Sequence, residues 1–317
     1  MEKLDAESYL QTGSNELRVL EYRVADQSFG INILKVSKIV SHLDEAVKLP
    51  ESHPAVRGLF RDQGQVIPLI DLAFFLGVDR PAVDREEVIV TEFFGIQTGF
   101  SVDWVEWIHH FLWKDVIDAT AVFSGINQRY VIGIVRPTDT RMILLLDYET
   151  ILLDLSPHLR DGEKVSDRTS LELTGKRVLI AEDSPAVRSM LADEMADLGF
   201  EVDVVGDGEQ GWEAFQKQSY DLVISDVEMP QMDGLALTMR IRQSDRPQTP
   251  VIVYSSIGDV GMKARAAFLK ADAHITKLNL DLLVQTADKL MRGEKITVDE
   301  SGEPEKRVTE LETIPIG

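Results

Sequence analysis

Short apolar stretches bounded by polar residues fill the first half of the chain and predict β-strands. They are rich in β-branched and aromatic residues, and Gly, Asp or Pro separates them. Because no regular helical pattern lies between them, we expect a barrel or a sandwich. Seven stretches are predicted as strands: 17–24, 28–33, 66–70, 88–94, 98–102, 130–135 and 142–146.

Two segments of this half resemble each other. Segments 65–76 and 141–152 each contain an apolar strand, an Asp and a short apolar stretch with helical spacing. Asp71 and Asp147 stand at the junction, where a carboxylate can cap the first free N–H groups of a helix. The pair predicts two similar β units, and chance similarity between apolar runs is the alternative.

The second half alternates apolar strands with helical stretches. This alternation predicts an α/β domain with a doubly wound, flavodoxin-like parallel sheet covered on both faces. We expect strands at 178–181, 202–205, 222–225, 251–254 and 273–276, and helices at 186–198, 210–218, 235–243, 262–269 and 280–291. The predicted boundaries are 1–155 for the β domain, 156–175 for a linker, 176–293 for the α/β domain and 294–317 for an acidic flexible tail.

The net charge and the absence of cysteine restrict which partners the protein can bind and in which compartment we expect it. The formal net charge is −21, and acids outnumber bases in both halves, so neither half offers a basic surface for nucleic acid or anionic lipid. The chain has no cysteine, which excludes disulfides and thiol nucleophiles. No signal peptide and no apolar run of about 18 residues is present, so we expect a cytoplasmic protein without membrane insertion.

Polar residues follow four of the predicted parallel strands, where ligands of doubly wound sheets bind. They are Glu182-Asp183, Asp226, Ser255 and Lys277. Two carboxylates ~4 Å apart repel each other by about 4 kcal/mol at an effective dielectric near 20. The single lysine can neutralise the charge of only one of the three carboxylates. Mg²⁺ prefers such oxygen ligands. A cation, an ammonium and a hydroxyl around a nucleophilic carboxylate make a phosphoryl-transfer site.

These residues resemble the receiver domain of two-component response regulators, over about 176–293. The resemblance also includes Met229-Pro230 and Met232-Asp233-Gly234. It implies that Asp226 accepts phosphate from a kinase phosphohistidine, that Ser255 binds a phosphoryl oxygen and that Lys277 pairs with the phosphate. It further implies a Mg²⁺ site made by Glu182, Asp183, Asp226 and the backbone carbonyl of Glu228.

The sequence departs from the receiver pattern at two positions. Leu278 follows Lys277, where the family usually has Pro. His274 takes the position of the family's aromatic switch residue, three residues before the lysine. A polar strand residue is one interpretation of His274, and a switch rotamer with some pH dependence is the other.

The segment Gly206–Gly211 matches the Gly-x-Gly-x-x-Gly fingerprint of dinucleotide-dependent enzymes, an alternative function. Asp207 and Glu209 would place two negative charges where a pyrophosphate must bind. A tight turn before a helix, with glycine supplying positive φ, is the favoured interpretation.

The first half, about 15–155, resembles CheW-like chemotaxis coupling domains in Phe29–Val36, in Val56–Leu59 with Val66–Asp71, and in Met142–Asp147. The resemblance implies two small SH3-like barrels that bind chemoreceptor tips and the chemotaxis histidine kinase. It also implies a partner surface that includes four residues: Val36, Ile39, Gly58 and Gln63. The family commonly has Arg where Gln63 precedes Gly64.

A coupling domain followed by a receiver resembles the CheV family. This order implies a phosphorylation-controlled scaffold, recruited to receptor arrays at the inner membrane, that couples chemoreceptors to the kinase. A response regulator acting mainly as a phosphate sink is the alternative. No nucleophile or metal cluster precedes residue 155, so we expect no enzyme beyond a receiver that slowly hydrolyses its own acyl phosphate.

Overall fold

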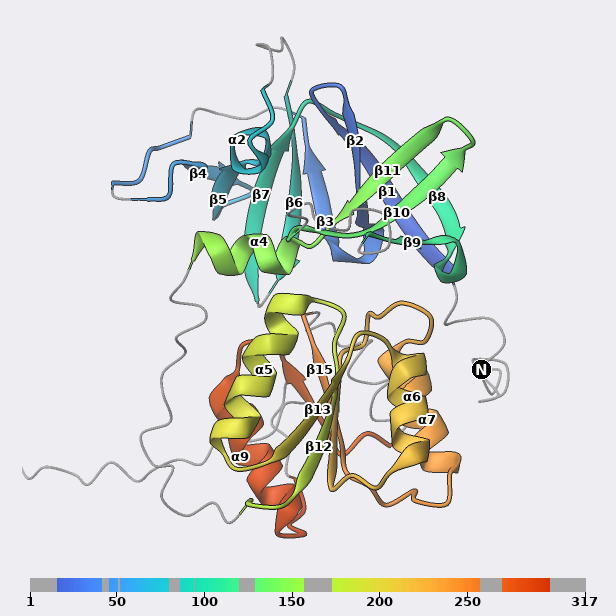
Figure 1. Ribbon diagram of the computed structural model, residues 1–317. Coiled ribbons are helices and arrows are strands. Elements are labelled where there is room, and N and C mark those ends of the chain that lie inside the picture. The colour runs from blue at the N-terminus through green and yellow to red at the C-terminus, as the bar shows by residue number, and fades with distance from the viewer. Residues whose placement is uncertain are drawn as a thin grey trace, which may run out of the picture.

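The computed structural model describes residues 16–41, 46–50, 52–79, 86–93, 95–119, 129–156, 173–256 and 270–296. Figure 1 shows a β half stacked on an α/β half. This arrangement agrees with the predicted fold classes. The predicted helix 262–269 and most of the predicted linker and tail lie outside the described residues.

Two sheets make up the β half, in agreement with the two predicted β units. One sheet has the order β8-β1-β2-β11-β10-β9, and the other has the order β3-β6-β7-β5-β4. The second sheet is inserted in the chain between β2 and β8. The strands of the first sheet are β1 (Glu16–Val24), β2 (Gln27–Asn32), β8 (Trp104–Leu112), β9 (Ile117–Asp118), β10 (Val131–Thr138) and β11 (Arg141–Leu146). The strands of the second are β3 (Val36–Val40), β4 (Val56–Asp62), β5 (Gln65–Asp71), β6 (Glu87–Phe93) and β7 (Ile96–Val102), and two short 3-10 helices are η1 (Ile33–Lys35) and η2 (Trp113–Asp115).

The two segments that resemble each other in sequence, 65–76 and 141–152, also form the same sequence of strand, Asp and helix in the structure. Strand β5 leads through Asp71 into helix α2 (Leu72–Leu76), and β11 leads through Asp147 into helix α4 (Tyr148–Leu155). Each repeat strand also makes a parallel pair within its sheet, β5 with β7 and β11 with β2. Both aspartates cap as predicted, since each accepts a hydrogen bond of 3.0 Å from a backbone N–H three residues later.

The α/β half contains a parallel sheet of order β13-β12-β14-β15-β16, as the alternation predicts. Helices α5 and α9 cover one face, and α6 and α7 cover the other (Figure 1). Apolar side chains are buried all along the central strands, which explains their continuous hydrophobic runs. The strands are β12 (Arg177–Ala181), β13 (Glu201–Val205), β14 (Leu222–Ser225), β15 (Val251–Ser255) and β16 (Ala273–Thr276), and the helices are α5 (Pro185–Asp197), α6 (Gly208–Lys217), α7 (Gly234–Gln243) and α9 (Leu280–Met291).

The glycines of segment 206–211 have a different role from the one predicted. Positive φ occurs at none of Gly206, Gly208 and Gly211, so the turn does not require left-handed backbone there. Close packing explains Gly208 instead, because a Cβ at this position would lie 2.2 Å from the carbonyl oxygen of Met232. Asp207 caps α6, where its Oδ1 accepts a hydrogen bond of 2.8 Å from a backbone N–H.

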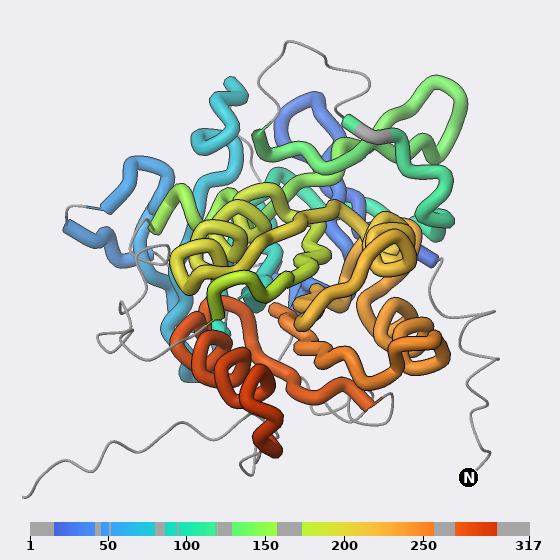
Figure 2. The backbone as a smooth tube through the Cα atoms, turned by 60° about the horizontal axis from the view of Figure 1, so that its bottom comes forward, coloured from blue at the N-terminus to red at the C-terminus, as the bar shows by residue number. Residues whose placement is uncertain are grey.

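Helix α4 joins the two halves. It belongs to the β half by sequence, yet it packs against α5 of the α/β half (Figures 1 and 2). Tyr148 and Ile151 of α4 lie in one continuous apolar cluster with Val187 and Leu191 of α5. The short segment after β11 therefore brings the β half onto the carboxyl ends of the parallel strands.

Candidate functional site

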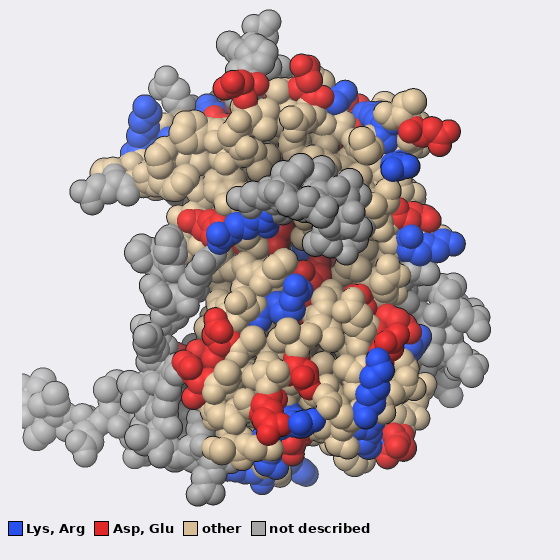
Figure 3. Space-filling view, in the orientation of Figure 1, with Lys and Arg blue, Asp and Glu red and all other residues tan. Residues whose placement is uncertain are grey.

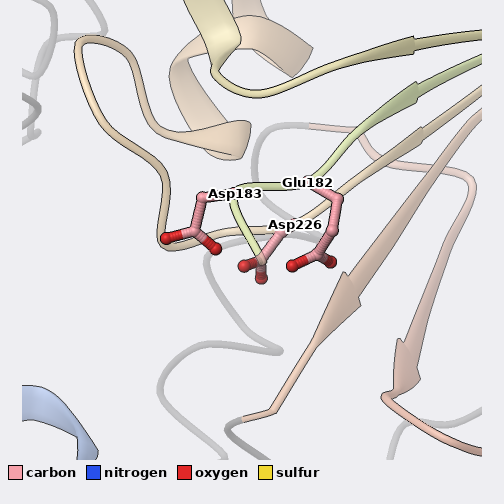
Figure 4. A group of neighbouring side chains, drawn as sticks. All are labelled: Glu182, Asp183 and Asp226. Atoms are coloured by element: carbon pink, nitrogen blue, oxygen red, sulfur yellow. The ribbon is translucent and has the colours of Figure 1, made fainter. Parts of the chain in front are cut away.

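Three carboxylates converge at the carboxyl edge of the parallel sheet. Glu182 and Asp183 follow β12, Asp226 follows β14, and all three point into the same space (Figure 4). One oxygen from each lies within 4.8 Å of the others. Glu182 and Asp226 are buried, whereas Asp183 is partly exposed. The order of the parallel strands thus brings together side chains that are up to 44 positions apart in the chain.

Lys277, directly after β16, connects these acids. Its buried Nζ donates to Glu182 Oε1 at 2.8 Å and to Asp226 Oδ2 at 3.0 Å. The other Asp226 oxygen, Oδ1, accepts a hydrogen bond of 2.6 Å from the backbone N–H of Val227. The lysine therefore holds the Asp226 carboxylate in a fixed orientation.

Leu278 stands where the family usually has proline, and its backbone N–H has a hydrogen-bond partner. Its backbone N–H donates a hydrogen bond of 2.6 Å to Tyr254 Oη, a bond that proline could not make. Leu278 has a φ of 65°, which is uncommon for a residue other than glycine. The contact with Tyr254 holds the loop that carries Lys277.

The remaining predicted receiver residues lie around this cluster. Ser255 ends β15 and is buried. His274 is buried in β16, where it pairs in register with Val253. Glu228 lies in the loop after β14, with its carboxylate almost fully enclosed.

Two residues of the β half reach this site, and sequence reasoning missed both. Glu149, in the first turn of α4, accepts hydrogen bonds from Lys277 Nζ at 3.0 Å and from Ser256 Oγ at 2.6 Å. Lys35, in η1, has its Nζ 3.7 Å from Glu149 Oε1 and 3.8 Å from Glu228 Oε2. One sequence signal exists for Glu149: it takes the place of the apolar Ala73 in the second copy of the repeat.

The two lysines and Glu149 are charged in this arrangement. Burial opposes the charged form of Lys277, but the carboxylates around it outweigh burial and raise its pKa well above the ordinary value. Burial likewise opposes ionisation of Glu149, yet Lys277 and Lys35 lower its pKa to about 2. Glu149 therefore sits in the site as a carboxylate anion.

The other acids carry more negative charge than the lysines can neutralise. Burial raises the pKa of Asp226 to about 6 and the pKa of Glu228 to about 7, with lysines opposing the rise in each case. Burial also raises the pKa of Glu182 well above its ordinary value. Such a site is stabilised by protonation or by a further cation.

A hard divalent cation fits these groups. Glu182 Oε2 and Asp183 Oδ1 are buried and have no hydrogen-bond partner among the described residues. Carboxylate oxygens are the ligands that Mg²⁺ prefers, and the surplus negative charge favours a dication. The residues present are therefore suited to Mg²⁺.

The predicted partner residues belong to the sheet β3-β6-β7-β5-β4, on its outer strands β3 and β4 and in the turn after β4. Ile39 on β3 is 43% exposed, whereas Val36 on the same strand packs partly against the core. Gly58 on β4 has a φ of 143°, and a Cβ there would lie 2.2 Å from a backbone oxygen of Val47. Gln63, in the β4–β5 turn, has a φ of 46°. Ile39 is exposed, whereas Gly58 is buried and allows the close approach of the chain at Val47.

Charged side chains of both signs occur along the whole sequence and over both halves of the molecule (Figure 3). On the face shown in Figure 3, acidic and basic side chains are interspersed over both halves. Within the described ranges, no helix has both the length and the apolar character that crossing a membrane requires.

Comparisons with known proteins match both halves. The CheW-like domain family model matches residues 18–156, and the response regulator receiver domain model matches residues 178–288. Chemotaxis protein CheV3 of Helicobacter pylori is 30% identical over 299 residues, which are 87% of this chain and 95% of the relative. Chemotaxis protein CheV2 of the same organism is 27% identical and covers 84% of this chain and 92% of its own. The scaffolding protein TtCheW from Thermoanaerobacter tengcongensis is 24% identical, with a TM-score of 0.38, over 41% of this chain and 88% of its own.

Proposed function

This chain belongs to the CheV family of chemotaxis proteins, and from that membership we propose that it is a phosphorylation-controlled adaptor whose phosphoacceptor is Asp226. It takes part in chemotaxis signal transduction as an adaptor that carries a phosphorylatable receiver. The observation that carries the choice of Asp226 is its position: the carboxylate is bound by Lys277 and lies within the cluster suited to a cation.

In the proposed reaction, a carboxylate oxygen of Asp226 attacks the phosphorus of a phosphohistidine on the chemotaxis histidine kinase. The new O–P bond makes an acyl phosphate, and the broken N–P bond returns an imidazole to the kinase. Lys277 and Ser255 would bind phosphoryl oxygens. His274, which pairs in register with Val253, two residues before Ser255, would respond to the change. Water would later hydrolyse the acyl phosphate slowly, with no separate catalytic domain required.

Mg²⁺ would be held by Glu182, Asp183 and Asp226 together with the backbone carbonyl of Glu228. When bound, it would neutralise charge that develops on the phosphoryl oxygens. The protein's own residues position the nucleophile: Lys277 fixes one oxygen of Asp226, and the Val227 N–H fixes the other.

The β half would couple chemoreceptor tips to the kinase, as its CheW-like fold suggests. We include Val36, Ile39, Gly58 and Gln63 in the proposed partner region. Recruitment to membrane receptor arrays would follow from this binding, without insertion into the bilayer.

Phosphotransfer from a radiolabelled chemotaxis histidine kinase in Mg²⁺ buffer tests the assignment of the phosphoacceptor. We expect Asp226→Asn to abolish labelling of this chain. Asp193→Asn, an exposed position on α5, is the matched control and should be labelled like the native protein. Persistent labelling of the Asp226 variant would overturn the proposal.

A further inference from the structure

The β half places a carboxylate on the groups that are proposed to bind phosphate. Glu149 is 1% exposed, and its two oxygens accept separate hydrogen bonds, one from Lys277 and one from Ser256. Both donors follow strands of the receiver sheet, β16 and β15. A phosphoryl group on Asp226 would seek the same ammonium and a hydroxyl at the same strand end.

Lys277 cannot serve both groups in the observed arrangement. An ammonium has three N–H donors, and Lys277 directs them at Glu149, Glu182 and Asp226. A phosphoryl oxygen would therefore have to replace one of these acceptors. Glu182 and Asp226 belong to the receiver itself, so Glu149 is the acceptor that can leave through a movement of the β half.

Further contacts keep α4 on the receiver. Ser184 Oγ donates to Asp147 Oδ2 at 3.0 Å, which ties the cap of α4 to the cap of α5. Lys35 lies between Glu149 and Glu228 and so pairs with one carboxylate from each half. The site thus recognises the first turn of α4 through hydrogen bonds and opposite charges.

We propose that Glu149 is an intramolecular ligand of the phosphate-binding groups of the receiver, so that docking of the β half and phosphorylation of Asp226 exclude each other. This inference rests on the proposed function of Asp226. Phosphorylation then releases α4 and separates the two halves, and dephosphorylation allows Glu149 to return. The β half and the phosphoryl group are competitors for Lys277.

Small ions can reach the edge of the site while the halves are docked. A cavity of about 950 Å³ lies between the halves and is lined by Asp183 from the site and by Trp113 and Arg129 from the β half. Competition with Glu149, rather than exclusion by the β half, should therefore limit the binding of a small phosphoryl mimic.

Titration of the full chain with beryllofluoride in saturating Mg²⁺, followed by calorimetry, tests the competition without a kinase. We expect Glu149→Ala to bind this mimic at least tenfold more tightly than the native chain, which corresponds to a native site that is available at most about one tenth of the time. Glu149→Gln should bind with intermediate affinity, because its amide can still contact Ser256 but not as an anion. Asp154→Ala, an acid-to-alanine change at the other end of α4, should match the native affinity.

Small-angle scattering supplies the second measurement. The native chain should expand when beryllofluoride binds, whereas Glu149→Ala should already be expanded without it. Unchanged or weaker binding by both folded Glu149 variants, while the native chain binds the mimic, would overturn this inference and leave the proposed function standing. Undiminished binding by Asp226→Asn would instead refute the assignment of the phosphoacceptor. Circular dichroism shows which variants are folded.

Discussion

Replacement of Lys277 by methionine separates its electrostatic role from its packing role. Methionine retains most of the apolar stem but removes the ammonium, which donates to three buried carboxylates at 2.8–3.0 Å. Lys35 then remains as a nearby cation, 3.7 Å from Glu149. Loss of one partner from a buried ion pair typically costs about 3–5 kcal/mol, because the remaining charge is left uncompensated. We expect Lys277→Met to lower the free energy of unfolding by that amount in metal-free buffer.

The assay is urea unfolding followed by circular dichroism, with and without Mg²⁺. Lys176→Met is the matched control, because Lys176 forms a partly exposed pair with Asp221 whose loss should cost no more than about 1 kcal/mol. Mg²⁺ should restore part of the loss in Lys277→Met, since a cation that binds only the folded state stabilises it. A loss below about 1 kcal/mol without metal would refute the idea that Lys277 compensates buried negative charge.

Two further predictions concern the β half. Gly30→Ala would place a Cβ 2.5 Å from a Val19 methyl, so overpacking should lower the free energy of unfolding by roughly 1–3 kcal/mol, measured by thermal unfolding. Gly206→Ala is the control, because the nearest atom to its Cβ would lie at 3.6 Å and the stability loss should be smaller. Asp147→Ala should cost about 1 kcal/mol as a lost helix cap and should also expand the molecule in small-angle scattering. Asp71→Ala removes the equivalent cap of α2 and should leave the overall dimensions unchanged; equal expansion of both variants would refute a special role for the α4 contact.

The fold of the second half was predictable because each local signal agrees with the others. Apolar strand runs and helical stretches alternate, and the observed strands and helices begin or end within about two residues of those predicted. The positions of Glu182, Asp226 and Lys277 follow from that alternation, since parallel strands bring their carboxyl ends to one edge. The convergence of these three side chains could therefore be predicted from the sequence alone.

The seven predicted stretches include no counterpart of β3, β4, β8 or β9. For β3 and β8 the reason is physical. Both are only half-buried, and β8 has exposed Trp107 and Ile108 side by side rather than a strict alternation. Periodicity detects a strand when one face is buried and the other is exposed. A strand that is partly exposed on both faces lacks that signal, and the pairings of β3 with β6 and of β8 with β1 each also contain a register shift.

The contribution of the β half to the site could not be read from sequence. Glu149 and Lys277 are separated by 128 positions, and their contact depends on how two complete domains dock. Local patterns fix each domain, but docking depends on the shape and charge of surfaces that exist only after folding. The only local sign of this contact is Glu149 itself, a charged residue at a position that is apolar in the other copy of the repeat. That sign does not identify Lys277 as the partner.

The charge of the docking residues explains why docking should respond to phosphate rather than to metal. Lys35 and Glu149 add one positive and one negative charge, and the carboxylate of Asp147 adds a negative charge that acts on Asp183. Docking therefore does not reduce the surplus of carboxylates that favours Mg²⁺. Phosphorylation instead converts the single negative charge of Asp226 into about two, and it adds oxygens that need Lys277. Docking is therefore compatible with bound Mg²⁺ but opposed by a phosphoryl group, so the phosphoryl group should control the separation of the two halves.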